Sequence, residues 1–129
     1  GRWGRDLLQG GAGNDWLEGG SGPDTMFGGA GEDVLMGENA RDVMTGGADA
    51  DVFAFDDDAR GGTITDWQNG LDRIDLTRID AIAGLEDLKM TFIGQNMAQI
   101  EGANDDGKDF ALTIVSDTTL SLGAEDFVF

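Results

Sequence analysis

The sequence has no cysteine and no histidine, and only 8 of its 129 residues are lysine or arginine. The lack of cysteine excludes disulfides and thiol chemistry, and the lack of histidine excludes Cys/His zinc sites and histidine-based catalytic triads. The 26 acidic residues give a net charge of −18, which argues against binding to nucleic acid or to an anionic membrane surface. The sequence also shows no signal peptide and no apolar run of the roughly 18 residues that a membrane helix needs.

A nine-residue pattern of glycine and aspartate recurs six times in the first 54 residues. Three copies are complete, at 10–18 (GGAGNDWLE), 19–27 (GGSGPDTMF) and 28–36 (GGAGEDVLM). A partial copy precedes them at 1–9, and two degenerate copies follow at 37–45 and 46–54. The sixth place is always aspartate: Asp6, Asp15, Asp24, Asp33, Asp42 and Asp51. The eighth place is always apolar: Leu8, Leu17, Met26, Leu35, Met44 and Phe53. A fixed period with a fixed carboxylate indicates a solenoid whose turns bind hard cations.

Each repeat is expected to form a turn over its first six residues and a short strand over its last three. Glycine allows backbone angles that other residues avoid, so that carbonyl groups can point at one centre. Stacked coils would place the eighth residues in one inner column, which makes a thin core. Because such a core does not offset the chain entropy of so many glycines, we expect metal binding to contribute folding energy directly.

The composition changes near Asp56, since 14 of the 22 glycines lie in residues 1–47. We therefore divide the chain into a repeat region, 1–54, and a β-rich capping region, 55–129. Alternation and β-branched content predict strands at 52–55, 62–67, 73–76, 88–93, 97–101, 111–115 and 118–122. Hairpin turns are expected at 94–96 and 102–109, and a short helix at 81–87. The capping region can bury a conventional core and cover the open end of the solenoid.

The nonapeptides resemble the GGxGxDxUx repeats of RTX proteins, which Gram-negative bacteria secrete. Segment 62–76 (GTITDWQNGLDRIDL) resembles the one that follows the repeats in serralysin-type metalloproteases and in alginate-epimerase R-modules, with Trp67 where phenylalanine is usual. The last residues, Asp126–Phe129, resemble the ending of type I secretion signals. The resemblance implies an all-β fold, a parallel β-roll (a right-handed calcium-binding solenoid) followed by a β-rich C-terminal capping segment.

In that family each calcium ion lies between two turns that are stacked two repeats apart. The earlier turn provides its second and fourth carbonyl groups and its aspartate, and the later turn provides its first and third carbonyl groups and its aspartate. Carried over to this chain, the resemblance implies four sites: Arg2, Gly4 and Asp6 with Gly19, Ser21 and Asp24; Gly11, Gly13 and Asp15 with Gly28, Ala30 and Asp33; Gly20, Gly22 and Asp24 with Gly37, Asn39 and Asp42; Gly29, Gly31 and Asp33 with Gly46, Ala48 and Asp51. Six oxygen ligands, two of them from carboxylates, suit calcium better than magnesium.

Departures from the repeat pattern affect both ends of the stack. Arg2 stands where a glycine belongs, which weakens the first site. Glu38 and Ala40 replace two glycines of the fifth repeat, so we expect no further site above that turn.

The sixth repeat offers half of a fifth calcium site. Its donors would come from Gly47, Asp49 and Asp51, and Asp66 or Asp72 of the capping segment would complete it.

The resemblance implies a non-catalytic, calcium-binding C-terminal module of a larger secreted protein. The module would stay loosely folded in the cell, fold on meeting extracellular calcium after type I export, and stabilise the upstream domain. Its partners would be calcium ions, that upstream domain and the type I secretion machinery. Residues 55–129 show no nucleophile with a base that would indicate an enzyme.

A carbohydrate-binding accessory module that holds polyuronate is the alternative function. Trp3 and Trp16 offer either a sugar-stacking surface or cover for a neighbouring strand. The acidic balance opposes direct binding of an anionic polymer, although calcium could bridge the two. Asp56-Asp57-Asp58 is interpreted as a solvated loop in preference to a metal site.

Overall fold

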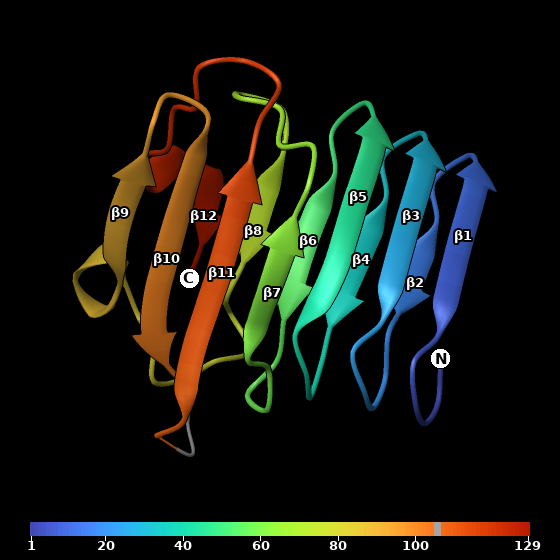
Figure 1. Ribbon diagram of the computed structural model, residues 1–129, viewed down its shortest axis with the longest axis horizontal. Helices are drawn as coiled ribbons and strands as arrows, with labels where there is room; N and C mark the ends of the chain where they lie inside the picture. The colour runs from blue at the N-terminus through green and yellow to red at the C-terminus, as the bar shows by residue number, and fades with distance from the viewer. Residues whose placement is uncertain (105–106) are drawn as a thin grey trace.

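The computed structural model describes residues 1–104 and 107–129, which form two facing β-sheets (Figure 1). The larger sheet has seven strands in the order β1-β3-β5-β7-β11-β10-β9, and the smaller has five in the order β12-β8-β6-β4-β2. The larger sheet consists of β1 (Leu7–Ala12), β3 (Thr25–Ala30), β5 (Asp42–Ala48), β7 (Gly61–Ile64), β9 (Lys89–Ile93), β10 (Met97–Ala103) and β11 (Asp109–Val115). The smaller sheet consists of β2 (Trp16–Glu18), β4 (Val34–Gly37), β6 (Val52–Phe55), β8 (Arg73–Asp75) and β12 (Phe127–Val128).

From β1 to β8 the chain alternates between the two sheets, so that one coil contains two repeats. Leu7 pairs in parallel with Thr25, and Thr25 pairs with Val43, each step being 18 residues long. β7 and β8 continue the same alternation, in parallel with β5 and β6. The prediction of a parallel β-roll is therefore confirmed.

The strands of the larger sheet are longer than the three residues expected. β1 and β3 have six residues and β5 has seven, because each continues into the glycines of the next repeat. Gly11, Gly29 and Gly47 lie in register along this extension, with φ angles of 105°, 119° and 106°. A Cβ atom on Gly29 would clash with the carbonyl of Gly11, so the close approach requires glycine.

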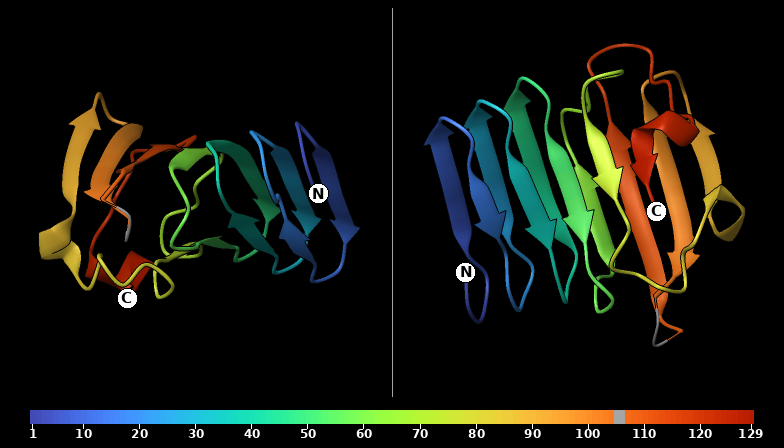
Figure 2. Two further views of the ribbon diagram at one scale, coloured as in Figure 1. Left: turned by 90° about the horizontal axis from the view of Figure 1, so that it is seen from below. Right: turned by 180° about the vertical axis from the view of Figure 1, so that it is seen from behind.

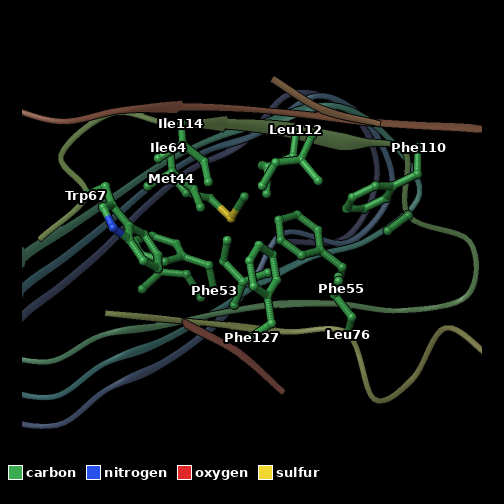
Figure 3. Packing of buried hydrophobic residues seen from close by; sticks show 14 of the residues in the cluster. Met44, Phe53, Phe55, Ile64, Trp67, Leu76, Phe110, Leu112, Ile114 and Phe127 are labelled. Atoms are coloured by element: carbon green, nitrogen blue, oxygen red, sulfur yellow. The ribbon is translucent and has the colours of Figure 1, made fainter. Parts of the chain in front are cut away.

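The eighth residues of the repeats make the inner core, as predicted, but they form two facing ladders, one on each sheet, where one column was expected. The larger sheet contributes the ladder Leu8, Met26, Met44 and Ile64. The smaller sheet contributes Leu17, Leu35, Phe53 and Ile74. All of these are buried except Leu8 at the open end, which is partly buried. Figure 3 shows that the core continues into the capping region, where the rings of Phe55 and Phe110 pack edge to face.

The capping region closes the roll with antiparallel strands. β11 pairs in parallel with β7 and then antiparallel with β10, which pairs with β9. Ile93 pairs with Met97, and Ala103 pairs with Asp109, so both predicted hairpins are confirmed; residues 105 and 106 of the second lie outside the described residues. Seen from behind (Figure 2), the C-terminal strand β12 lies beside β8.

Two expected elements are wrong. Residues 118–122 form no strand, because the side chain of Asn69 accepts the N–H of Ser121 and donates to the carbonyl of Thr119, in place of a neighbouring strand. The helix expected at 81–87 is only a 3-10 turn, Leu85–Asp87, because the fully extended Gly84 precedes it. No helix in the described ranges is long and apolar enough to cross a membrane.

Candidate metal centre

The turns of the repeats stack in two columns along the edges of the roll, and the aspartates link each turn to the next. In one column the backbone N–H of Asp6 donates to Oδ1 of Asp24 at 2.7 Å, and that of Asp24 donates to Asp42 at 2.9 Å. The other column shows the same bond from Asp15 to Asp33, from Asp33 to Asp51 and from Asp51 to Asp72, at 2.8–3.0 Å. The expected stacking of turns two repeats apart is therefore present at the aspartates.

The second carboxylate oxygen of five aspartates is buried and has no hydrogen-bond partner. These atoms are Oδ2 of Asp15, Asp24, Asp33, Asp42 and Asp51. A buried carboxylate oxygen without a partner is costly, and native proteins pair such groups with donors or cations. The donors present therefore fit a cation at each of these positions.

A backbone carbonyl of the stacked turn lies beside the unpartnered oxygen. A Cβ atom on Gly10 would lie 2.6 Å from the carbonyl oxygen of Gly28 and 2.7 Å from Oδ2 of Asp15. Gly28 has the same surroundings one coil later, between Oδ2 of Asp33 and the carbonyl oxygen of Gly46. The space that a first-place side chain would fill is thus a cradle lined by one carboxylate and one carbonyl oxygen.

The second and fourth places of the turns hold their carbonyl groups through left-handed backbone angles. Glycine provides these angles, with φ between 87° and 119°, at Gly4, Gly11, Gly13, Gly20, Gly22, Gly29, Gly31 and Gly47. Asp49 has a φ of 77° at the fourth place and is the sole residue other than glycine with a positive φ in the described part of the chain. Glu38 and Ala40 lack this conformation, so the fifth repeat does not reproduce the other turns.

Several of the predicted carbonyl ligands also take part in the backbone ladder. The carbonyls of Ser21 and Ala30 accept the N–H groups of Gly4 and Gly13 at 2.7 and 2.8 Å. The carbonyl of Arg2 accepts the N–H of Ser21 at 3.0 Å. Each carbonyl oxygen has two lone pairs, so one remains for a cation. The structure thus brings the paired aspartates and first-place carbonyls together most directly.

Burial raises the pKa of several stacked carboxyl groups. The pKa of Asp42 is raised to about 6 by burial, and the neighbouring carboxylates of Asp24 and Glu38 act in the same direction. Burial also raises the pKa of Asp51 to about 7 and that of Asp72 to about 6. The described residues contain no group of three or more acidic side chains that could hold a metal ion by themselves. A metal ion bound here would therefore need backbone carbonyls beside the carboxylates, a donor set that suits calcium.

Turn 66–72 of the capping segment covers the last repeat of the second column. Asp72 takes the place of the next stacked aspartate, and its Oδ2 accepts the N–H of Gln68 at 2.8 Å. Asp66 instead accepts the N–H groups of Gly46 and Gly47 at 2.9 and 2.8 Å. Oε1 of Gln68 is buried without a partner beside this turn, and no repeat pattern in the sequence pointed to it.

The acidic loop at 56–58 and the two tryptophans of the repeats lie away from the stacked aspartates. Asp57 and Asp58 are exposed, as a solvated loop requires, whereas Oδ1 of Asp56 is buried without a partner. Trp3 and Trp16 are 87% and 55% exposed. The indole of Trp16 donates to Glu18 at 2.8 Å and lies 6.0 Å from the Arg78 guanidinium.

Comparison with known proteins agrees with this geometry. The RTX calcium-binding nonapeptide repeat, in four copies, matches residues 1–35, 18–53 and 27–60. A search of curated proteins found no match. The chain is similar to the solution structure of the AlgE6R3 subunit of a mannuronan C5-epimerase from Azotobacter vinelandii, with 28% identity, a TM-score of 0.78, and coverage of 100% of this chain and 80% of that one. The AlgE6R2 subunit of the same organism's epimerase has the same fold, with 23% identity, a TM-score of 0.73, and coverage of 99% and 91%. Residues 1–60 therefore match the RTX calcium-binding nonapeptide repeats, within a chain that has the β-roll fold of the epimerase R-modules.

Proposed function

We propose that the chain is a calcium-folded module of a larger protein, in which residues 1–54 bind the ions and residues 55–129 cap the roll. The main support is the recurrence of one buried, unpartnered Oδ2 atom at the same place in five successive repeats. The four proposed sites pair Asp6 with Asp24, Asp15 with Asp33, Asp24 with Asp42, and Asp33 with Asp51. Calcium supplies the positive charge that these carboxylates lack and couples its own binding to the stacking of the coils.

We also propose a fifth ion above the sixth repeat. Asp49 adopts the left-handed angle that glycine has at the fourth place of the complete repeats, which orients its carbonyl in the same way. Oδ2 of Asp51 is buried and unpartnered, and Asp72 stacks above it as the other aspartates stack on one another. Asp66 is engaged by two backbone N–H groups, so Asp72 is the better candidate for the second carboxylate.

The same chemistry supports folding after export from a Gram-negative cell. A net charge of −18 disfavours the compact state until cations bind, and cytosolic calcium is too scarce to supply them. In this proposal the chain passes the type I machinery unfolded, meets extracellular calcium and then stabilises the upstream domain. At the C-terminus Phe127 is buried and its ring stacks on that of Phe129 at 5.7 Å, so these residues would serve the capping sheet after serving export.

Far-ultraviolet circular dichroism with a chelator and with added calcium tests the folding proposal. We expect β-structure to appear with calcium, and magnesium at the same concentration to substitute poorly because it prefers a smaller shell and keeps its waters. Isothermal titration calorimetry should give five ions for the unchanged chain and four for Asp72→Asn, because Asp72 belongs to no other proposed site. A fully structured repeat region in chelator would contradict the proposal.

A second candidate is the binding of polyuronate through calcium, which the similarity to a mannuronan epimerase subunit favours. Trp3 and Trp16 are the exposed aromatic groups for such a ligand, at the open end of the roll. Short oligouronates titrated into the calcium-loaded chain should bind, and Trp16→Ala should weaken the binding while Trp16→Phe retains it. A calcium-loaded chain that folds but takes up no oligouronate would reject this candidate and leave the first one intact.

A further inference from the structure

The outer face of the larger sheet carries two rows of side chains that contain no charge. One row crosses all the strands from Leu7 on β1 to Thr91 on β9, through Thr25, Val43, Thr63 and Thr113. The second row lies beside the first, two residues further along most strands and two residues earlier along the antiparallel β10, and runs from Gln9 through Phe27 to Ile93. We call these two rows the neutral face.

The neutral face differs sharply from the rest of a chain in which 26% of the residues are charged. The outward residues of the smaller sheet include Glu18, Arg73 and Asp75. The turns at both edges of the roll carry the aspartates, and beyond the two rows the strands of the capping hairpin carry Lys89 and Glu101. The charges of the described chain thus surround the neutral face without entering it.

The neutral face is also open and partly apolar. Leu7, Phe27, Val43 and Ile93 expose 66%, 39%, 40% and 45% of their surface. In Figure 1 the larger sheet faces the viewer, and no other segment of the described chain crosses it. A continuous exposed face with apolar side chains is typical of an interaction surface.

We propose that the neutral face binds the neutral face of a second copy of this chain. Even with five calcium ions bound, the chain would keep a net charge of about −8, so a basic partner would choose the aspartate-rich edges, and two copies of the chain can approach only through faces without carboxylates. A two-fold contact places the same patch of both copies together. The neutral face is where two such chains can meet without placing carboxylates against one another.

The size of the face sets the strength of this dimer. Seven strands spaced by about 4.8 Å, with about 17 Å of each strand in use, give a footprint of roughly 600 Å² per copy. The total of roughly 1,200 Å² is at the lower end of specific interfaces, and two sheets can pack face to face over such an area. We therefore expect a reversible dimer with a dissociation constant on the order of 10–100 µM. Because both rows cross from coil to coil, the dimer requires the folded roll and hence the proposed calcium-dependent folding.

Sedimentation equilibrium in saturating calcium, over about 5–500 µM chain, tests the dimer. Val43→Glu places a charge in the centre of the face and should raise the dissociation constant at least about tenfold, because like charges would meet across the contact. Leu7→Glu, on the edge strand, is a second variant in case Val43→Glu affects folding. Val34→Glu is the matched control, since Val34 lies on the outer face of the smaller sheet, and it should leave the dimer unchanged.

Circular dichroism of the same samples separates this proposal from the folding proposal. A chain that folds with calcium but stays monomeric throughout overturns the dimer and leaves calcium-driven folding intact. Equal weakening by Val43→Glu and Val34→Glu also overturns it, because the contact would then not use the neutral face. Retention of a monomeric chain on a neutral glucan matrix would assign the face to carbohydrate instead.

Discussion

Replacing Asp24 by alanine should raise the calcium concentration needed for folding more than replacing Asp15. Asp24 is assigned to two calcium sites, and its Oδ1 accepts the N–H of Asp6 at 2.7 Å. Asp15 is assigned to one site, and its carboxylate accepts no hydrogen bond within the described part of the chain. Loss of a hydrogen bond to a charged group costs about 1.5–3 kcal/mol, and loss of a carboxylate ligand adds a cost at each ion.

With about 2 kcal/mol for each lost ligand, these terms give about 6 kcal/mol for Asp24→Ala and about 2 kcal/mol for Asp15→Ala. Because about four ions bind in one folding transition, the two costs raise the calcium midpoint about tenfold and about twofold. Calcium titrations followed by circular dichroism measure both midpoints, and the exposed Asp57→Ala serves as a control that should not shift. If Asp15→Ala proves as damaging as Asp24→Ala, the sharing of aspartates between turns two repeats apart is refuted.

Three further predictions concern pH, the cradle and the C-terminus. In chelator, the roll should gain stability as the pH falls from about 7.5 to 5. The pKa values of Asp42 and Asp51 in the folded chain, about 6 and about 7, lie above the ordinary 3.8. The folded chain therefore binds protons more tightly than the unfolded chain, and acid favours folding. In calcium the direction should reverse, since protons displace the ion, and a calcium midpoint that falls with acid would contradict the ligand assignment. Gly28→Ala should raise the calcium midpoint severalfold, because its Cβ would fill the space between Oδ2 of Asp33 and the carbonyl of Gly46. Gly70→Ala is the control: a Cβ there meets no other atom, so only the backbone strain of alanine at a φ of 76° should remain. Removal of Val128 and Phe129 should reduce export through a type I system and change the melting temperature little, because both side chains are partly exposed. Unchanged export would show that these residues serve only the sheet.

The period of the sequence predicted the roll because each structural requirement repeats with it. An aspartate and an apolar residue at fixed places imply stacked turns and an inner ladder, and Asp24 and Met26 lie where that argument puts them. Contacts between residues far apart in the sequence account for the features that the sequence did not predict. Residues 118–122 have the β-branched content of a strand, but the Asn69 side chain, about 50 positions away, takes up their backbone groups. Asp66 was one of two candidates to complete the fifth site, and both its oxygens instead accept the N–H groups of Gly46 and Gly47, about 20 positions away.

The coil of two repeats restricts how the length of this protein can change. Insertion or deletion of one nonapeptide would exchange the two sheets for every repeat on one side of the change, which moves Thr25 or Val43 from the larger sheet to the smaller one. The capping strands β7 and β8 would then meet partners of the wrong sheet, and the two columns of aspartates would lose their register with Asp72. Only changes of 18 residues preserve sheets, columns and cap together. Repeat arrays of this kind should therefore gain or lose nonapeptides in pairs, one whole coil at a time. An array with an even number of repeats should then keep an even number.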